Sequence, residues 1–159
     1  MSKSVYIEWR NNGFWVYDVA LGVLLKHLID SATESVKRNP APWLNQSIER
    51  WRVQAVVSDP GMYLDENWST NQVQHFINLL EDCCESLSSR HAFSADEMQA
   101  WDILDGEGID ARGDNEFPTN VVMELGLAIV ALLKGALPDP PDRTWWFYGT
   151  RTGRTTIEI

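Results

Sequence analysis

The sequence predicts an α+β fold: a single globular domain spanning residues 1–159, with about five helices around one buried helix. The helices are expected to pack on a small antiparallel sheet formed by N- and C-terminal β-hairpins. Two observations predict this fold. The most apolar run of the chain lies at 118–137, and alternating or aromatic segments stand near both ends. A chain of 159 residues buries roughly two-thirds of its unfolded surface as one domain.

The first predicted element is a hairpin over residues 5–17. Val5, Ile7 and Trp9 alternate with more polar residues, which is the period of a half-buried strand. Asn12-Gly13 is a dipeptide that accepts the positive φ angles of a tight turn. The sequence therefore predicts a turn at this dipeptide.

Helical spacing of apolar residues follows. It predicts helices over about 19–37, 42–57 and 69–88, and a short one that runs through Met98, Trp101 and Leu104. Ser94 and Glu97 have the spacing of a capping box at the start of the short helix. Residues 61–68 have no clear period and are predicted to be an ordered loop.

The run at 118–137 is predicted to be the buried central helix. Glu124 lies early in it and Lys134 late, each with the charge that the helix dipole favours. Gly135 and Pro138 end it. Only nine residues lie between Glu124 and Lys134, whereas a membrane span needs about 20. A core helix is therefore predicted and no membrane span.

The last predicted element is a second hairpin. An aromatic run at 145–148 precedes a glycine-flanked turn at 149–153, and alternation resumes towards residue 159. Because an isolated hairpin is marginally stable, the two hairpins are expected to form one antiparallel sheet. The C-terminal strand, apolar on both faces, is also a candidate edge for a homodimer.

The net charge of −10 is concentrated in one part of the chain. Residues 81–124, the acidic segment, hold twelve acidic and two basic residues, and the remainder holds eleven of each. Such a field attracts cationic partners and repels nucleic acid. A basic protein partner is predicted, without direct contact to nucleic acid.

Composition favours a reduced cytoplasmic protein. The N-terminal residues contain no apolar signal-peptide core. Cys83 and Cys84 are adjacent, which is poor geometry for a disulfide if both lie on one helix.

The spacing of the candidate residues does not fit the known catalytic or metal-binding motifs. The EF-hand pattern started at Asp105 breaks at Ile109 and Asp110, where a ligand and a glycine are needed. No Cys-x-x-Cys, His-x-x-x-His or Gly-x-Ser-x-Gly pattern occurs. No cofactor or metal is predicted, and an enzyme is disfavoured.

The predicted binding surface is the acidic loop, residues 105–117, together with the residues just before it in the chain. Acids steer a basic partner, and neighbouring aromatic residues anchor it. The predicted binding residues are Asp102, Asp105, Glu107, Asp110, Asp114, Glu116, Trp101 and Phe117.

These properties predict a non-enzymatic binding protein. Small size, acidity and the lack of a catalytic motif resemble the general class of bacterial immunity and antitoxin-like inhibitors, which cap a basic toxin. The likeness is one of properties, and no motif carries it. The alternative is a small enzyme or small-ligand-binding protein with a tryptophan-lined cleft. One form of this alternative depends on a metal ion.

Overall fold

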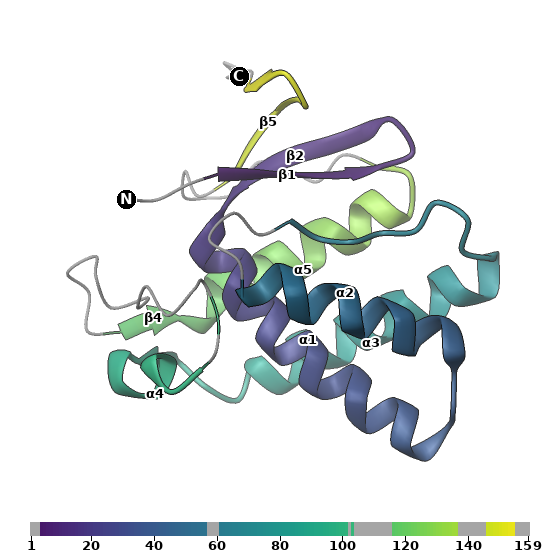
Figure 1. The fold of residues 1–159 in the computed structure, drawn as a ribbon. Coiled ribbons are helices and arrows are strands. Elements are labelled where there is room, and N and C mark those ends of the chain that lie inside the picture. The colour runs from purple at the N-terminus through teal and green to yellow at the C-terminus, as the bar shows by residue number, and fades with distance from the viewer. Residues whose placement is uncertain (1–3, 57–60, 102, 104–115, 137–145, 155–159) are drawn as a thin grey trace.

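The computed structural model describes residues 4–56, 61–101, 103, 116–136 and 146–154. It is α+β, with a sheet on one side of a layer of helices (Figure 1), which confirms the predicted fold class. The elements are β1 (Ser4–Trp9), β2 (Asn12–Tyr17), α1 (Asp18–Arg38), α2 (Pro42–Val56), α3 (Thr70–Leu87), β3 (Ala92–Ser94), α4 (Ala95–Gln99), β4 (Glu116–Pro118), α5 (Thr119–Leu133), β5 (Trp146–Thr150) and β6 (Gly153–Arg154).

The N-terminal hairpin is present, but its turn lies two residues earlier than predicted. Positive φ angles occur at Arg10 and Asn11, at 46° and 70°, as a type I′ turn requires. Asn12 pairs with Trp9, so Gly13 lies within β2. A Cβ at Gly13 would clash with the backbone oxygen of Ile7 and would come 2.5 Å from Cζ of Tyr6. Glycine is therefore needed there for the close approach of β1 and not for the turn.

The two terminal hairpins form one antiparallel sheet, as predicted. The strand order is β1-β2-β5-β6, and the hairpins join where β2 pairs with β5. The inward residues of β1 and β2 are buried against the helices: Val5, Ile7, Trp9, Phe14 and Val16. The predicted alternation at residues 155–159 lies outside the described residues.

Two helices share the centre of the helical layer. α5 is buried as predicted, with ten of its fifteen residues in the interior. α1 contacts α2, α3 and α5 as well as β2, and every residue from Asp18 to Leu25 is buried. The first half of α1 therefore packs on all sides, and α1 and α5 together form the core.

α5 is shorter than the predicted 118–137, mainly because its C-terminal end is capped at Gly135. Pro118 is the N-cap residue. At the other end Gly135 has a φ of 83°, and N–H groups of Gly135 and Ala136 donate to the carbonyls of Leu132 and Ala131. These bonds form a Schellman motif, which ends the helix.

α3 and α5 pack closely as antiparallel neighbours. Thr119, at the start of α5, donates to the carbonyl of His91, just after α3, while Lys134 lies 3.7 Å from Glu81. Between these contacts, a Cβ on Gly126 would lie 2.5 Å from Sγ of Cys84. The helices approach this closely because residue 126 has no side chain.

The loop at 61–68 is ordered, as predicted, because α2 holds its backbone. The indole Nε1 of Trp51 donates to the carbonyl of Tyr63 at 2.8 Å, and the N–H of Tyr63 donates to Oε1 of Gln54 at 2.7 Å. Trp51 is fully buried, and Met62 and Trp68 fix the two ends of the loop in the core.

The structure corrects the prediction that residues 105–117 form a single loop. Glu116 and Phe117 belong to β4, which pairs with β3 through Phe93↔Phe117 and Ser94↔Glu116. The short helix before the loop is also shorter than predicted, since α4 ends at Gln99.

Candidate functional site

The β3–β4 ladder holds together the two ends of the stretch between Ser94 and Glu116. Thr119, which is buried, strengthens this junction, because its hydroxyl donates to the carbonyls of Arg90 and His91. The described residues at the two ends of this stretch, Ser94 and Glu116, therefore lie side by side in the fold.

The predicted binding residues divide between described and undescribed positions. Glu116 is exposed at the start of β4, whereas Trp101 and Phe117 are half-buried and pack against the core. The remaining predicted acids lie outside the described residues: Asp102, Asp105, Glu107, Asp110 and Asp114.

A cluster of aromatic rings holds the residues that precede the acidic loop in the chain. The His27 ring of α1 lies 4.8 Å from the Phe93 ring and 5.3 Å from the Trp101 ring, centroid to centroid. Phe93 and Trp101 also contact each other edge to face at 5.2 Å. Their combined packing holds β3 and the end of α4 against α1.

His27 is the titratable member of this cluster. Its Nδ1 lies 2.9 Å from the carbonyl of Val23. Burial lowers the pKa of His27. The Val23 carbonyl and Asp30 oppose this shift, while Lys26 and Arg90 add to it. His27 thus favours its neutral form more strongly than a free histidine does.

Arg90 neutralises one acid of the segment. Its two Nη atoms donate to the two carboxylate oxygens of Glu97, each at 2.6 Å, and its guanidinium lies 4.5 Å from the centre of the Phe93 ring. These hydrogen bonds lower the pKa of the Glu97 carboxyl. The Glu97 carboxylate therefore pairs with Arg90, and the predicted capping box is present only as the Ser94 half.

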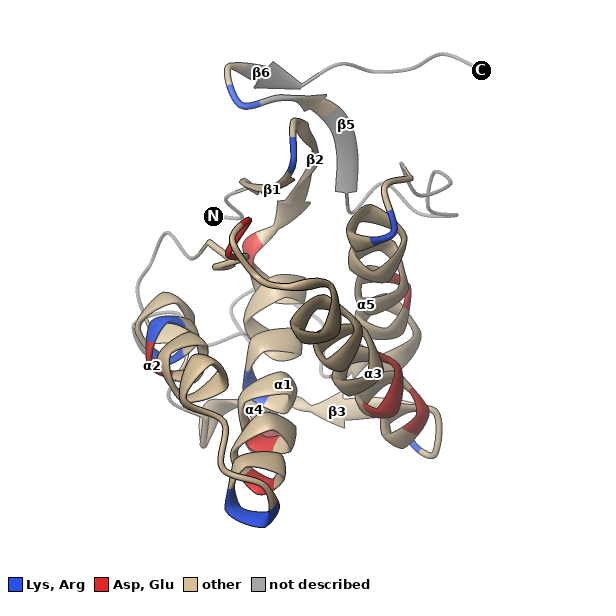
Figure 2. Ribbon diagram, turned by 90° about the vertical axis from the view of Figure 1, so that its right-hand side faces the viewer, with Lys and Arg blue, Asp and Glu red and all other residues tan. Residues whose placement is uncertain are grey.

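Further acids lie on the outer face of α3. Glu81, Asp82 and Glu85 are exposed there, and Glu81 is 3.7 Å from Lys134. Figure 2 shows acidic segments on α3 and basic segments on α2, on opposite sides of the view. Among the described residues, these acids of α3 and the arginines of α2 therefore lie apart in space.

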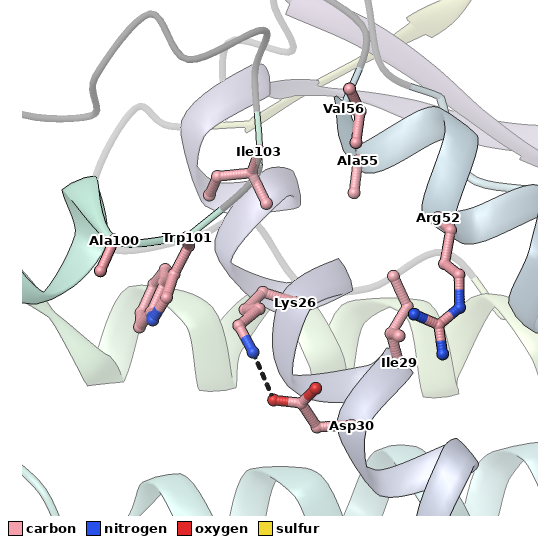
Figure 3. A pocket seen from close by; sticks show the side chains of 9 residues that line it. All are labelled: Lys26, Ile29, Asp30, Arg52, Ala55, Val56, Ala100, Trp101 and Ile103. Carbon is pink, nitrogen blue, oxygen red and sulfur yellow. Dashed lines mark hydrogen bonds and ion pairs between the residues drawn. The ribbon is translucent and has the colours of Figure 1, made fainter.

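A pocket of about 400 Å³ opens where α1 and α2 face the end of α4 (Figure 3). Its apolar surface is formed by Ile29, Ala55, Val56, Trp101 and Ile103. Three charged side chains line the same pocket: Lys26, Asp30 and Arg52. Sequence reasoning missed this pocket, because its residues come from three separate segments.

Tryptophans other than Trp101 serve different parts of the structure. Trp9, Trp51 and Trp68 are buried in the core, and Trp43 packs edge to face on Trp68 at 5.6 Å. Trp101 is the only one among the residues that line the pocket.

Neither thiol is poised for nucleophilic chemistry. Burial raises the pKa of Cys83 to about 12 and that of Cys84 to about 11. Thiolates, which attack electrophiles and bind metals, are therefore rare at both positions near neutral pH. In the described part of the chain, no three His, Cys, Asp or Glu side chains cluster in a way that could hold a metal ion.

None of the helices in the described ranges combines the length and apolarity of a bilayer crossing. Comparisons with protein-family models, with curated proteins and with solved structures find no match to this chain.

Proposed function

We propose that this chain is a non-enzymatic binding protein whose acidic segment engages a basic protein partner. The observation that carries the proposal is the concentration of charge. The acidic segment holds twelve acids and two bases, while the rest of the chain is balanced. One of those two bases, Arg90, is paired with Glu97 inside the segment, and ten of the twelve acids have no basic residue of the segment to offset them.

The described geometry supports a directed field. The exposed acids of α3 belong to a helix that packs on α5, and Glu116 belongs to β4, which pairs with β3. Basic residues such as Arg50 and Arg52 lie on α2 (Figure 2). A one-sided negative field speeds the encounter with a cationic surface and orients it.

Trp101 and Phe117 are the proposed anchors. Both are half-buried: Phe117 belongs to the β3–β4 ladder, and Trp101 contacts Phe93 of β3. Aromatic side chains held by neighbours lose little rotamer freedom on binding, which is a reason for their enrichment among interface hot spots. The acids would then govern the association rate, and the aromatic residues the dissociation rate.

The most concrete version is an immunity or antitoxin-like inhibitor in a bacterial cytoplasm. A toxin that acts on nucleic acid carries a cationic surface to bind phosphates. An acidic protein surface can cover such a surface, and the same charge disfavours direct binding of the inhibitor to nucleic acid.

The test begins with affinity capture from the source cells at low salt and release at high salt. The captured basic protein is then purified, and its association is measured against ionic strength. Amide substitution of Asp105, Glu107, Asp110 and Asp114 should slow association about tenfold or more and flatten its salt dependence. The melting temperature should not fall.

The matched control removes the same number of charges elsewhere, by amide substitution of Glu34, Glu49, Asp142 and Glu158. We expect this variant to keep most of the wild-type association rate. Equal rates for the two variants would show that total charge, and not the acidic segment, governs binding. Failure to capture a basic protein at low salt would also contradict the proposal.

A further inference from the structure

The pocket between α1, α2 and the end of α4 points to a second binding site, which shares Trp101 with the proposed protein-binding surface. Its volume of about 400 Å³ falls in the range of small-molecule sites, roughly 300–1,000 Å³. Its lining combines apolar side chains with a few charged groups, which is the usual composition of such sites.

The apolar part of the pocket suits a ring or a branched hydrocarbon. The side chains of Ile29, Ala55 and Ile103 line the pocket and are otherwise buried, so packing in the core holds them in place. Trp101 supplies an aromatic wall, and its ring is fixed by contacts to His27 and Phe93. A fixed aromatic wall binds a flat apolar group without losing its own conformational freedom.

The charged side chains of the pocket determine which sign of ligand charge it favours. Lys26 and Asp30 pair with each other at 2.6 Å, so their charges largely cancel. Arg52 is the remaining charged residue of the lining, and Glu49, which does not line the pocket, lies 3.8 Å from its Nε. The guanidinium of Arg52 therefore favours an anionic group in the pocket.

Arg52 is held in position and retains donors for a ligand. Its Nη2 donates to Oγ1 of Thr33 at 3.3 Å, and its Nε lies 3.8 Å from Oε1 of Glu49. Among the described residues both contacts involve Nη2 and Nε, so the N–H groups on Nη1 can face a ligand. A hydrogen bond from a guanidinium N–H to a carboxylate is charge-assisted, which makes it roughly twice as strong as a hydrogen bond between neutral groups.

We infer that this pocket binds a small organic monocarboxylate with an aromatic or branched apolar body. The apolar body packs on Trp101, Ile29 and Ala55, and the carboxylate accepts hydrogen bonds from Arg52 at the rim (Figure 3). A second negative charge is disfavoured, because Asp30 lies on the same rim.

The test uses the full chain and three probes of one shape: naphthoate, naphthamide and naphthylmethylammonium. Binding is followed by calorimetry and by the NMR signal of the Trp101 indole N–H, assigned with the Trp101→Phe variant. We expect naphthoate to bind at least about fivefold more tightly than the neutral amide, and the ammonium probe to bind most weakly.

Arg52→Gln and Arg50→Gln form a matched pair of variants. Both remove one positive charge from α2, but Arg50 lies over the Tyr63 ring, 4.5 Å from its centre, and does not line the pocket. We expect Arg52→Gln to weaken naphthoate binding about tenfold and Arg50→Gln to weaken it less than about twofold. Naphthamide affinity should be the same in both variants.

Three results would overturn the inference. One is the absence of naphthoate binding at millimolar concentration. Another is equal weakening by the two arginine variants, which would indicate a long-range charge effect. The third is tighter binding of the ammonium probe, which would assign the pocket to a basic group, such as a side chain of the proposed protein partner.

Discussion

The helical layer contains two junctions that differ in how tightly they close. At the closed junction, α3 and α5 meet at Gly126 and Cys84, and no room remains for even one methyl group. At the open junction, α1, α2 and the end of α4 leave a pocket of about 400 Å³. Both junctions belong to one core.

The difference follows from the residues at each contact. Small residues let two helix backbones approach until their surfaces touch. Lys26 and Arg52 are long, and their charged ends lose hydration if helices close over them. Both side chains remain partly exposed, at 31% and 51%. Long charged side chains at a helix junction therefore keep a pocket open.

The largest expected effect distinguishes a tryptophan of the packed interior from the one at the open junction. Trp51 is fully buried, stacks on Phe76 at 5.3 Å and donates to the carbonyl of Tyr63. Trp51→Ala should lower the free energy of unfolding by about 3–5 kcal/mol. Trp101→Ala should lower it by no more than about half as much, because Trp101 is only partly buried. Urea denaturation of both variants measures the difference, and equal losses would contradict the comparison.

A smaller effect tests the closed junction directly. Gly126→Ala should destabilise the fold by about 1–3 kcal/mol, because the new methyl group would lie 2.5 Å from Sγ of Cys84. In an open helix the same change would stabilise by about 1 kcal/mol. Urea denaturation again gives the measurement.

The control for this prediction is a double substitution. The next atom near the new methyl group, Cδ1 of Leu24, is 3.8 Å away, so Sγ of Cys84 is the main obstacle. Cys84→Ala combined with Gly126→Ala should recover most of the lost stability. If the two losses simply add, the helices at this junction are not in direct contact through these residues.

The smallest expected effect lies at the edge of the open junction and depends on pH. Burial lowers the pKa of His27 in the folded state, so below a pH of about 6.5 the unfolded chain binds more protons than the folded one. Stability should therefore fall as the pH drops from about 7 towards the folded-state pKa. His27→Phe should remove this part of the pH dependence.

Thermal unfolding at several pH values between about 5 and 8 tests this prediction. His91→Gln, at an exposed position, serves as the matched control and should keep the wild-type profile. A wild-type profile in His27→Phe would show that other groups cause the acid sensitivity.

The sequence contained enough local information to predict the helices and the two terminal hairpins but not the register of the first hairpin. Asn12-Gly13 has the composition of a turn, yet a turn there would leave Ser4–Ile7 opposite residues of α1. The observed register pairs all six residues of β1 with β2. Pairing of the whole strand therefore outweighs the turn preference of one dipeptide.

The candidate sites were less accessible to sequence reasoning. The strands β3 and β4 have three residues each, too few to show alternation, and they pair across more than twenty positions. The pocket depends on the angle between α1 and α2, which no local pattern encodes. The charge of the acidic segment, by contrast, is a property of composition and was visible at once.

The ladder between β3 and β4 has a consequence for how this fold tolerates change. Ile103 is 4% exposed and Glu116 is paired to Ser94, so residues 104–115 are attached at two fixed points. Both points are held by residues outside 104–115, so a foreign peptide in place of that segment would join the fold at the same two positions, and this domain is a candidate scaffold for peptide display.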